Sequence, residues 1–381
     1  MKIAFVHEWF VTYAGSEKVL SEMVAEFPGA DIFCLVDFSK GKFAPKFLGK
    51  KFHTSALQIF RFAPALYRNL LPLMAIAVEQ FDLSSYDIVI SNSHAFAKGV
   101  MTGPDQLHIC YCYTPMRYAW DFQHQYLRDH HLSGRGIGWL VRMVLHRLRI
   151  WDNRTADGVD HFIACSNYIG RRILRVYRRS SETIYPGVDT DFFRIGDNKQ
   201  SFYLTSSRMV VYKRILLIVE AFKSMPDKRL VVIGDGPQYK EILKAAGPNV
   251  TVMGFQKDEV LLEHMQKARA FIFAAEEDFG ITPLEAQACG TPVLAYGRGG
   301  GSETVVDGVT GLHFWTQSTE AICDAIERFE NSTLTFDPAT IRSHAERFSI
   351  TRFRAEFKAR VEGYWEEHLN SDHRLREAAG R

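Results

Sequence analysis

Cysteines are few in this sequence, and their spacing forms no metal site or redox motif. The six cysteines are scattered over 381 residues, without a Cys-x-x-Cys pair or a Cys/His cluster. This distribution argues against a zinc finger, a thioredoxin-like motif and a disulfide framework. It is typical of buried, reduced thiols in a cytosolic protein.

Long apolar runs are also missing. No run reaches 18 apolar residues, and the longest candidate, residues 70–78, contains Pro72. A helix needs about 20 apolar residues to cross a bilayer, so no segment is predicted to span one. The N-terminus leads straight into a strand pattern with an acidic residue and lacks the features of a signal peptide. We therefore expect a cytoplasmic protein.

Neither sign of charge is in excess. The sequence has 46 Lys and Arg against 44 Asp and Glu, which gives a net charge of +2. A polyanionic partner such as nucleic acid is therefore not expected. The content of 46% hydrophobic and 24% charged residues is typical of a globular protein, and the length allows two domains.

Short apolar strand patterns alternate with helical patterns along the whole chain. This order predicts an α/β fold with buried parallel strands in βαβ units. The polar, turn-rich segment 186–200 separates two series and marks a domain boundary. We expect two doubly wound domains that face each other across a cleft, with ligands at the carboxyl ends of strands. The expected strands lie at 3–6, 31–35, 88–91, 107–111, 161–165 and 183–185, and at 202–206, 230–233, 250–253, 270–274 and 292–295.

The most informative segment is residues 276–292, which have the sequence EEDFGITPLEAQACGTP. It follows a strand pattern and places Glu277 and Glu285 on either side of a helix start. A helix N-terminus attracts phosphate, and carboxylates accept hydrogen bonds from sugar hydroxyls. A second interpretation is structural. Residues 282–285 fit a capping box with Pro283 at the first helical position, so Glu285 could serve only as a cap.

The pattern E-x7-E followed by AxACGTPV resembles the donor site of retaining glycosyltransferases of family 4, which have the GT-B fold. The resemblance implies that Glu277 lies beside the donor sugar and that Glu285 binds the ribose hydroxyls. It also places Phe279, Gly280 and Ile281 against the nucleotide-sugar donor.

The same resemblance implies that the chain has two domains and a C-terminal helix. Residues 1–190 would form a Rossmann-like acceptor-binding domain, and residues 200–348 would form a Rossmann-like nucleotide-sugar-binding domain. Residues 349–381 would form a C-terminal helix that crosses back to pack on the first domain. A helical stripe of Phe353, Phe357 and Val361 supports that helix.

Residues 206–213, SSRMVVYK, resemble the family segment G-R-L-V-x-x-K, whose two cations hold the donor diphosphate. Arg208 and Lys213 match it. Fixed cations stabilise the charge that develops on a departing diphosphate. The sequence departs from the pattern twice, because Ser207 and Arg214 each replace a usual glycine.

Three glycine-containing turns have less specific patterns. Gly15 matches a family glycine whose backbone approaches the donor phosphate, although a plain cap by Ser16 explains this helix start equally well. The turn at 234–237 is interpreted as structural. The segment 297–304 is either a plain loop or a close approach to the donor.

On the acceptor side, residues 111–121 have the sequence YCYTPMRYAWD. They resemble the H-T-P-M-R-Y-x-W-D stretch of family 4 mannosyltransferases that build O-antigens and exopolysaccharides. Tyr113 stands where that branch usually has a histidine, and Tyr is a poor base near neutral pH. His94 and His7 are the remaining candidates at strand ends, and His94 is assigned a catalytic role.

Arg117 has two interpretations. It would hold an acceptor phosphate, or it would pair with Asp121 four positions later on a helix.

The resemblance implies a metal-independent, retaining hexosyltransferase without a cofactor. Its first-choice donor is GDP-mannose, and its acceptor is a lipid-linked glycan of surface polysaccharide synthesis. Asp189-Thr190-Asp191 mimics a D-x-D metal motif, but it lies in the interdomain connection and is interpreted as turn chemistry.

A lipid-linked acceptor implies a peripheral position at the inner face of the cytoplasmic membrane. Two segments mix cations with apolar residues: the lysine-rich loop around residues 40–51 and the basic amphipathic helix 138–151. The loop is the preferred membrane candidate, because packing against the sheet explains the helix.

Two alternative functions remain. A nucleotide-sugar epimerase of the same fold would isomerise the donor without an acceptor. A non-catalytic binding subunit, which the loss of the histidine at position 113 would allow, would bind the donor without turnover.

Overall fold

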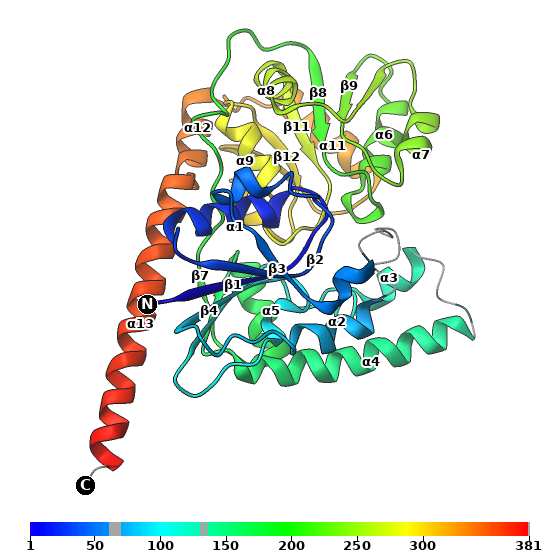
Figure 1. The fold of residues 1–381 in the computed structure, drawn as a ribbon. Helices are drawn as coiled ribbons and strands as arrows, with labels where there is room; N and C mark the ends of the chain where they lie inside the picture. The colour runs from blue at the N-terminus through cyan, green and yellow to red at the C-terminus, as the bar shows by residue number, and fades with distance from the viewer. Residues whose placement is uncertain (61–69, 130–133, 135, 380–381) are drawn as a thin grey trace. The chain divides into compact units, whose positions relative to one another are not determined.

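The computed structural model describes residues 1–60, 70–129, 134 and 136–379, and the chain divides into two compact units (Figure 1). Unit 1 comprises Met1–Tyr185 and Arg354–Arg381, and unit 2 comprises Pro186–Phe353. The chain passes from one unit to the other at the start of the polar segment 186–200, which was singled out in the sequence as the connection.

Each unit is built on a parallel sheet. Within the described residues the strand order is β3-β2-β1-β4-β5-β6-β7 in unit 1 and β10-β9-β8-β11-β12-β13 in unit 2. In both sheets the chain builds outward from a central strand, returns, and continues in the other direction, which is the doubly wound order. The predicted α/β class with two doubly wound parallel sheets is confirmed.

The elements of unit 1 follow the alternation expected from the sequence. The strands are β1 (Ile3–Phe10), β2 (Asp31–Asp37), β3 (Phe52–Thr54), β4 (Ile88–Ser93), β5 (Leu107–Cys112), β6 (His161–Ala164) and β7 (Glu182–Thr183). The α-helices are α1 (Gly15–Glu26), α2 (Leu71–Val78), α3 (Gln123–Asp129), α4 (Ile137–Thr155), α5 (Asn167–Tyr177) and, from unit 2 into unit 1, α13 (Ile350–Ala379).

Unit 2 has the same alternation. The strands are β8 (Phe202–Ser206), β9 (Arg229–Ile233), β10 (Val250–Gly254), β11 (Ala270–Phe273), β12 (Val293–Tyr296) and β13 (Gly311–Phe314). The α-helices are α6 (Ile215–Lys223), α7 (Tyr239–Ala245), α8 (Asp258–Lys267), α9 (Ile281–Ala288), α10 (Gly301–Thr304), α11 (Thr319–Asn331) and α12 (Pro338–Glu346).

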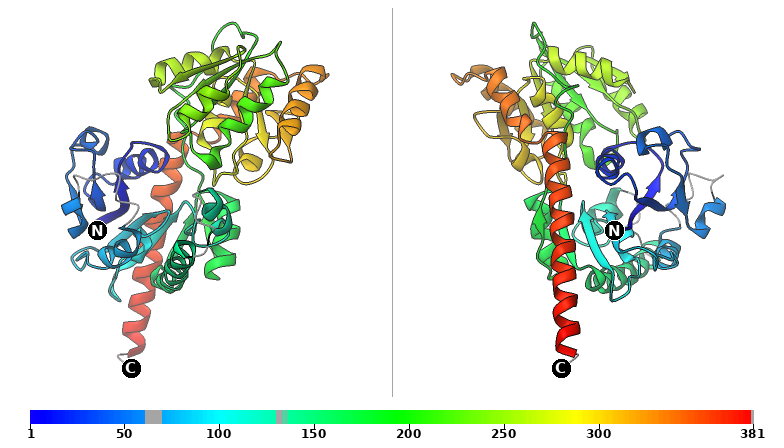
Figure 2. Two further views of the ribbon diagram at one scale, coloured as in Figure 1. Left: turned by 90° about the vertical axis from the view of Figure 1, so that its right-hand side faces the viewer. Right: turned by 60° about the vertical axis from the view of Figure 1, so that its left-hand side comes forward.

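Helices cover both faces of each sheet (Figure 1, Figure 2). In unit 1, Phe27 after α1 packs against Phe5 of the sheet and against Phe357 of α13, with ring centroids 6.4 and 6.3 Å apart. The opposite face packs on α2 and α4, whose inward residues belong to one buried cluster with β1, β2 and β4. In unit 2, α6, α7 and α11 cover one face, and α8, α9 and α12 cover the other.

The C-terminal helix α13 packs on unit 1 from Arg354 onward. Its predicted apolar stripe is buried, including Phe357 and Val361. Arg354 pairs with Glu22 of α1, and the Tyr364 ring stacks on His161 of β6 at 3.8 Å between centroids. These contacts tie the end of the chain to elements at its beginning.

None of the helices among the described residues combines the length and the apolarity needed to cross a bilayer.

Candidate functional site

The candidate site in unit 2 lies where the strand order of its sheet reverses. Strands β8 and β11 are hydrogen-bonded neighbours, although β8 comes first in the unit and β11 fourth. Because both strands are parallel, the loops that follow them leave the same edge of the sheet, which is where α/β proteins bind ligands. The loop after β8 carries Arg208 and Lys213, and the loop after β11 carries Glu277.

Lys213 and Glu277 are joined across this point by an ion pair between Nζ and Oε1. Their side chains are only 18% and 16% exposed. Partial burial strengthens the attraction between opposite charges relative to a pair in open water. Arg208, on the same loop as Lys213, is exposed. The site thus presents two cations and one carboxylate on the carboxyl edge of the sheet.

The backbone around Arg208 is held by the turn after β9. Met209 N donates to Asp235 O at 2.9 Å, and Gln238 N donates to Met209 O at 3.0 Å. A Cβ at Gly236 would lie 2.6 Å from Met209 O, so only glycine fits there. The turn at 234–237 therefore has the structural role predicted for it, and it also fixes the segment that carries Arg208.

Arg214 replaces a family glycine, and its backbone keeps the conformation that glycine would favour. Its φ of 58° and ψ of 25° are left-handed, and it is the residue before α6. A residue other than glycine pays about 1 kcal/mol in this region. The replacement of glycine by Arg214 therefore does not prevent a left-handed turn after Lys213.

The segment 297–304, for which two interpretations were open, supports the Glu277 loop. Glu277 and Gly299 form an isolated parallel bridge, and Gly300 N donates to Glu277 O at 2.6 Å. A Cβ at Gly299 would lie 2.5 Å from Glu277 O, and one at Gly300 would collide with Phe279 O. The glycines allow this backbone to lie directly against the loop that positions Glu277.

Helix α9 starts earlier than the sequence predicts. Its first residue is Ile281, and the preceding Gly280 has a left-handed backbone with φ 93° and provides no side-chain cap. Pro283 is therefore the third helical residue rather than the first, and the predicted capping box at residues 282–285 is wrong. Glu285 lies further along the helix and is 8% exposed. Glu285 therefore does not cap this helix.

Phe279 and Cys289, at the two ends of this segment, are buried. Phe279 packs against Phe348 with ring centroids 5.9 Å apart. Burial raises the pKa of the Cys289 thiol to about 12. The Lys199 ammonium lowers this pKa and the Glu285 carboxylate raises it, but burial has the largest effect. The thiol stays protonated at neutral pH, so Cys289 is unsuited to act as a nucleophile.

In unit 1, Gly15 and His94 follow the two strands at the corresponding switch point, β1 and β4. Gly15 is the first residue of α1, and the Glu17 side chain accepts a hydrogen bond from Ala14 N at 3.2 Å. The cap thus comes from Glu17 rather than from Ser16, because no side chain of the N-cap residue contributes. His94 packs edge-on against Trp9 with centroids 5.0 Å apart.

Tyr113 has a structural role where the mannosyltransferase branch has a histidine. Its hydroxyl donates to Ser16 O at 3.2 Å and accepts from Asn92 Nδ2 at 3.0 Å. Burial raises the pKa of Tyr113 well above its ordinary value, and the hydrogen bond from Asn92 only partly opposes this. The phenol therefore stays protonated and links the start of α1 to the end of β4.

Glu8 is a functional candidate that the sequence did not single out. It is fully buried in β1, and its carboxylate accepts hydrogen bonds from four successive backbone N–H groups, those of residues 94–97. These contacts define the loop that carries His94. The sequence feature that could have identified Glu8 is a carboxylate within an apolar strand pattern, because buried carboxylates are rare unless they have buried partners.

The proposed pairing of Arg117 with Asp121 does not occur. Asp121 instead pairs with Arg172 of α5, through Nη2 and Nε at 2.5 and 2.8 Å. Residues 117–122 form turns rather than a helix, so the four-residue spacing does not bring the two side chains together. Arg117 lies over the Phe122 ring at 4.5 Å.

Asp189 has the turn role predicted for it, because its carboxylate accepts a hydrogen bond from Phe192 N at 2.9 Å. Among the described residues, no group of three or more His, Cys, Asp or Glu side chains is arranged to hold a metal ion.

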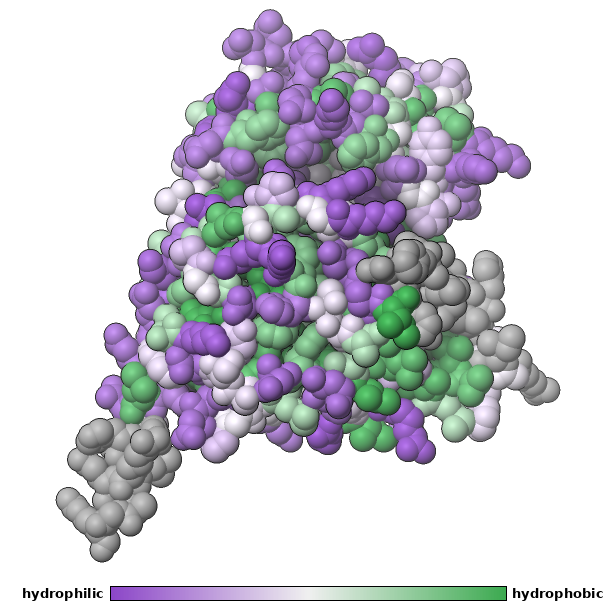
Figure 3. Space-filling view, viewed as in Figure 1, coloured by the Kyte–Doolittle hydropathy of each residue, from purple (hydrophilic) through white to green (hydrophobic). Residues whose placement is uncertain are grey.

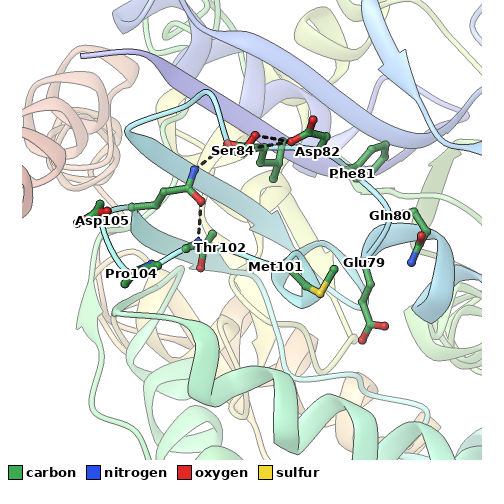
Figure 4. Close-up of a pocket in the computed structure, with 12 residues that line it drawn as sticks. Glu79, Gln80, Phe81, Asp82, Ser84, Met101, Thr102, Pro104 and Asp105 are labelled. Carbon is green, nitrogen blue, oxygen red and sulfur yellow. Dashed lines mark hydrogen bonds between the residues drawn. The ribbon is translucent and has the colours of Figure 1, made fainter.

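A separate pocket of about 540 Å³ lies in unit 1 (Figure 4). It is lined by the loops 79–84 and 101–106, which precede β4 and β5. It therefore opens at the amino ends of these strands, away from the edge that carries His94. The Gln106 side chain bridges its two loops through Leu83 O and Gly103 N. None of the predicted site residues lines this pocket.

The structure therefore groups Arg208, Lys213 and Glu277 in unit 2, with Gly280 directly before the adjoining helix α9 and Glu285 within it. It places Gly15 and His94 at the equivalent edge of unit 1.

The sequence matches two protein-family models. Residues 14–192 match Glycosyltransferase Family 4, and residues 188–347 match Glycosyl transferases group 1. The two matches adjoin and together reach from the start of α1 to the end of α12.

Curated relatives are similar over part of the sequence. A GDP-mannose-dependent alpha-(1-6)-phosphatidylinositol monomannoside mannosyltransferase of Mycolicibacterium smegmatis is 29% identical over 228 residues, which are 51% of this chain and 58% of the relative. A D-inositol 3-phosphate glycosyltransferase of Mycobacterium leprae is 27% identical over 205 residues, 47% of this chain and 48% of the relative. The matches thus span about half the length of these relatives.

Solved structures are similar over nearly the whole chain. HepE of Anabaena in complex with UDP-glucose has a TM-score of 0.68 at 17% identity and covers 95% of this chain and 100% of its own. Sucrose-phosphate synthase of Thermosynechococcus elongatus has a TM-score of 0.67 at 18% identity and covers 97% and 99%. At these identities the likeness shows the fold.

Proposed function

The chain belongs to glycosyltransferase family 4, and on that basis we propose that it transfers a sugar from a nucleotide diphosphate to an acceptor hydroxyl with retention of the anomeric configuration. The observation that carries the proposal is the Lys213–Glu277 pair on adjacent loops at the switch point of unit 2. A nucleotide sugar needs a cation for its diphosphate and a hydrogen-bond acceptor for its sugar within one site, and this pair supplies both.

In the proposed reaction, Arg208 and Lys213 bind the donor diphosphate. The bond between the anomeric carbon and the phosphate oxygen breaks, and the two cations stabilise the negative charge that develops on the leaving group. Glu277 orients the donor sugar, and Glu285 binds the ribose hydroxyls. The acceptor oxygen bonds to the same face of the anomeric carbon, and its proton passes to an oxygen of the departing phosphate.

Two residues of unit 1 also keep the roles that the family resemblance implies for them. His94 assists at the donor sugar, and the backbone at Gly15 approaches the donor phosphate. Phe279 and Ile281 frame the start of α9, where first-turn N–H groups favour an anion.

We propose mannose as the sugar and GDP-mannose as the donor, with a lipid-linked glycan at the inner face of the cytoplasmic membrane as the acceptor. The support is the mannosyltransferase-like segment 111–121 and the similarity to the GDP-mannose-dependent relative. No metal and no further cofactor take part in this proposal.

Steady-state transfer assays of Lys213→Ala and Glu277→Gln test these roles. Loss of Lys213 should lower kcat about 100-fold or more, because the cation acts on charge that develops in the transition state. Lys267→Ala is the matched control, since Lys267 also pairs with a glutamate but lies on the exposed surface of α8. Near-normal transfer in both site variants would reject the assignment.

The donor is identified first by thermal-shift measurements with nucleotide diphosphates and their sugars, since a ligand that binds the folded state raises its stability. Incubation with the donor alone then separates the alternatives. An isomerised sugar nucleotide would indicate an epimerase, and binding without turnover on any acceptor would indicate a binding subunit.

A further inference from the structure

The outer sides of α2 and α4 carry large apolar side chains that the core of unit 1 does not use. These residues are Leu73 (45% exposed) and Ile76 (59%) on α2, and Trp139 (63%), Leu140 (57%), Met143 (41%) and Ile150 (55%) on α4. We name them the α2–α4 face. In Figure 3, apolar side chains gather over these two helices.

Helix α4 is apolar on two sides. Its inward residues Leu145 and Leu148 are buried in the cluster with α2 and the sheet, as the amphipathic pattern predicts. Trp139, Met143 and Ile150 follow one another at spacings of four and seven residues, so they form a second stripe on the outer side. An outer stripe that faced only water would be polar. Packing against the sheet therefore accounts for the inward apolar side chains of α4, but not for the apolar side chains on its outer side.

The two helices form one continuous surface. Glu79, directly after α2, accepts hydrogen bonds from Trp151 Nε1 at 2.8 Å and from Arg154 at 2.7 Å, both on α4. The inward residues of both helices share one buried cluster. Single exposed apolar residues are common on protein surfaces, but six on two coupled helices form a patch that indicates a binding surface.

Two stretches of the sequence that contain α2 and most of α4 lack acidic residues up to their ends, where Glu79 and Asp152 follow. Residues 38–78 contain seven Lys and Arg and no Asp or Glu, and residues 130–151 contain four Arg and no Asp or Glu. The whole chain has 44 acidic residues against 46 basic ones, so this bias is local. On α4 itself, Arg142 and Arg147 alternate with the apolar stripe, and Arg147 is exposed.

We propose that the α2–α4 face docks on the surface of a lipid bilayer that contains anionic lipids. Apolar side chains would enter the interface between head groups and acyl chains, and the arginines would lie at the level of the phosphates. Trp139 suits that boundary, because its ring combines an apolar body with a polar N–H. Trp, Met and Arg are also enriched at protein interfaces, and the lipid-linked acceptor of the proposed function decides for a bilayer as the partner.

This inference deepens the proposed function, since a lipid-linked acceptor would be presented at that surface. It assigns docking to the α2–α4 face rather than to the lysine-rich loop favoured from the sequence. In the loop, Leu48 is the only large apolar side chain among residues 40–51 that is strongly exposed. Lysines alone attract a membrane through charge, whereas insertion requires apolar side chains.

Co-sedimentation of the full chain with vesicles tests the proposal without any need for turnover. The vesicles are phosphatidylcholine alone or phosphatidylcholine mixed with phosphatidylglycerol. The wild-type protein should bind the anionic vesicles about tenfold more strongly, and high salt should weaken this binding. Trp139→Gln combined with Met143→Gln should reduce binding to anionic vesicles about tenfold or more. Leu243→Gln, at a half-exposed apolar position on α7 of unit 2, is the matched control and should bind like the wild type.

Melting temperature and nucleotide-induced thermal shift are measured for each variant, so that misfolding and loss of donor binding are recognised separately. Equal binding to neutral and anionic vesicles would overturn the proposal, and so would unchanged binding of the double variant. A wild-type dimer that the double variant converts to a monomer would also overturn it, because the face would then be a protein interface. A chain that binds vesicles but shows no nucleotide-sugar chemistry would retain the docking face and lose the proposed function.

Discussion

At the scale of single residues, Glu8 accepts hydrogen bonds from four backbone N–H groups and from the Ser93 hydroxyl. Burial alone would raise the pKa of its carboxyl, but the charge of His94 and the N–H groups of Phe96, Ala95 and His94 outweigh it and lower the pKa below the ordinary value. A lowered pKa in the folded state means that the ionised carboxylate stabilises the fold. This stabilisation is present above the unfolded pKa and is lost as the pH falls through the folded one.

We expect Glu8→Gln to lower the free energy of unfolding by about 2–4 kcal/mol at pH 7, because an amide has one acceptor oxygen where the carboxylate has two. The difference from the wild type should begin to shrink as the pH falls below about 4.3, where the carboxyl is protonated in the unfolded chain but still ionised in the folded protein, and it should shrink further as the pH falls through the lowered pKa of the folded state. Urea unfolding at pH 7 and at pH 4 measures both values. A difference that is independent of pH would show that the charge of Glu8 does not contribute.

Single residues also show what resemblance can and cannot predict. Lys213 and Glu277 were each identified from the sequence, and the structure adds that they pair. By contrast, one of the two interpretations of Arg117 was that it pairs with Asp121, because a spacing of four residues favours contact on a helix. That interpretation was wrong, since the local chain is not helical and the partner, Arg172, lies 51 residues away. A contact across such a distance in sequence is determined by packing, which no local pattern records.

At the scale of elements, continuous apolar runs predicted the central strands well, because buried parallel strands need apolar side chains on both faces. The two strands that the sequence did not predict are β3, with only three residues, and β13, in which a glycine and a histidine interrupt the pattern. The start of α9 shows a different limit. Residues 282–285 satisfy a local capping pattern, but Gly280 allows a left-handed turn that begins the helix earlier.

The contact between the 297–304 turn and the Glu277 loop leads to a prediction for Gly300→Ala. The added Cβ would collide with Phe279 O, so one of the two backbone segments must move. We expect the unfolding free energy to fall by about 1–3 kcal/mol and kcat to fall about tenfold or more, because Glu277 would be displaced. Unfolding and steady-state transfer measurements check both effects.

Gly363→Ala is the control for this variant, since a Cβ at this position in α13 meets no atom within 4 Å. It should leave transfer unchanged and stabilise the helix by up to about 1 kcal/mol. Wild-type activity and stability in Gly300→Ala would mean that the turn does not position Glu277.

At the scale of the whole molecule, the two doubly wound sheets follow from the repeated alternation of strand and helix patterns. Their order then determines where the site must lie, because loops after neighbouring parallel strands share one edge. The overall composition predicted less about the function than the order of the strands did. A net charge near zero argued against a polyanionic partner, yet the average conceals two long segments without a single acidic residue. Charge bias becomes informative only when it is considered together with the surface on which it lies.

The charge balance of the proposed site predicts that transfer needs no metal ion. A departing nucleoside diphosphate requires positive charge close to its phosphates, and Mg²⁺ supplies this charge in many phosphate-handling enzymes. Here Arg208 and Lys213 supply two fixed cations on one loop, beside the positive end of α9. Transfer rates in excess EDTA should therefore stay within about twofold of the rates in Mg²⁺. Lys213→Ala should remain impaired when Mg²⁺ is added, because among the described residues no group of three or more His, Cys, Asp or Glu side chains is arranged to hold the ion. Activity that EDTA abolishes and Mg²⁺ or Mn²⁺ restores would show instead that a metal bridges the phosphates, and Glu277 would then be a candidate ligand rather than a partner of the sugar.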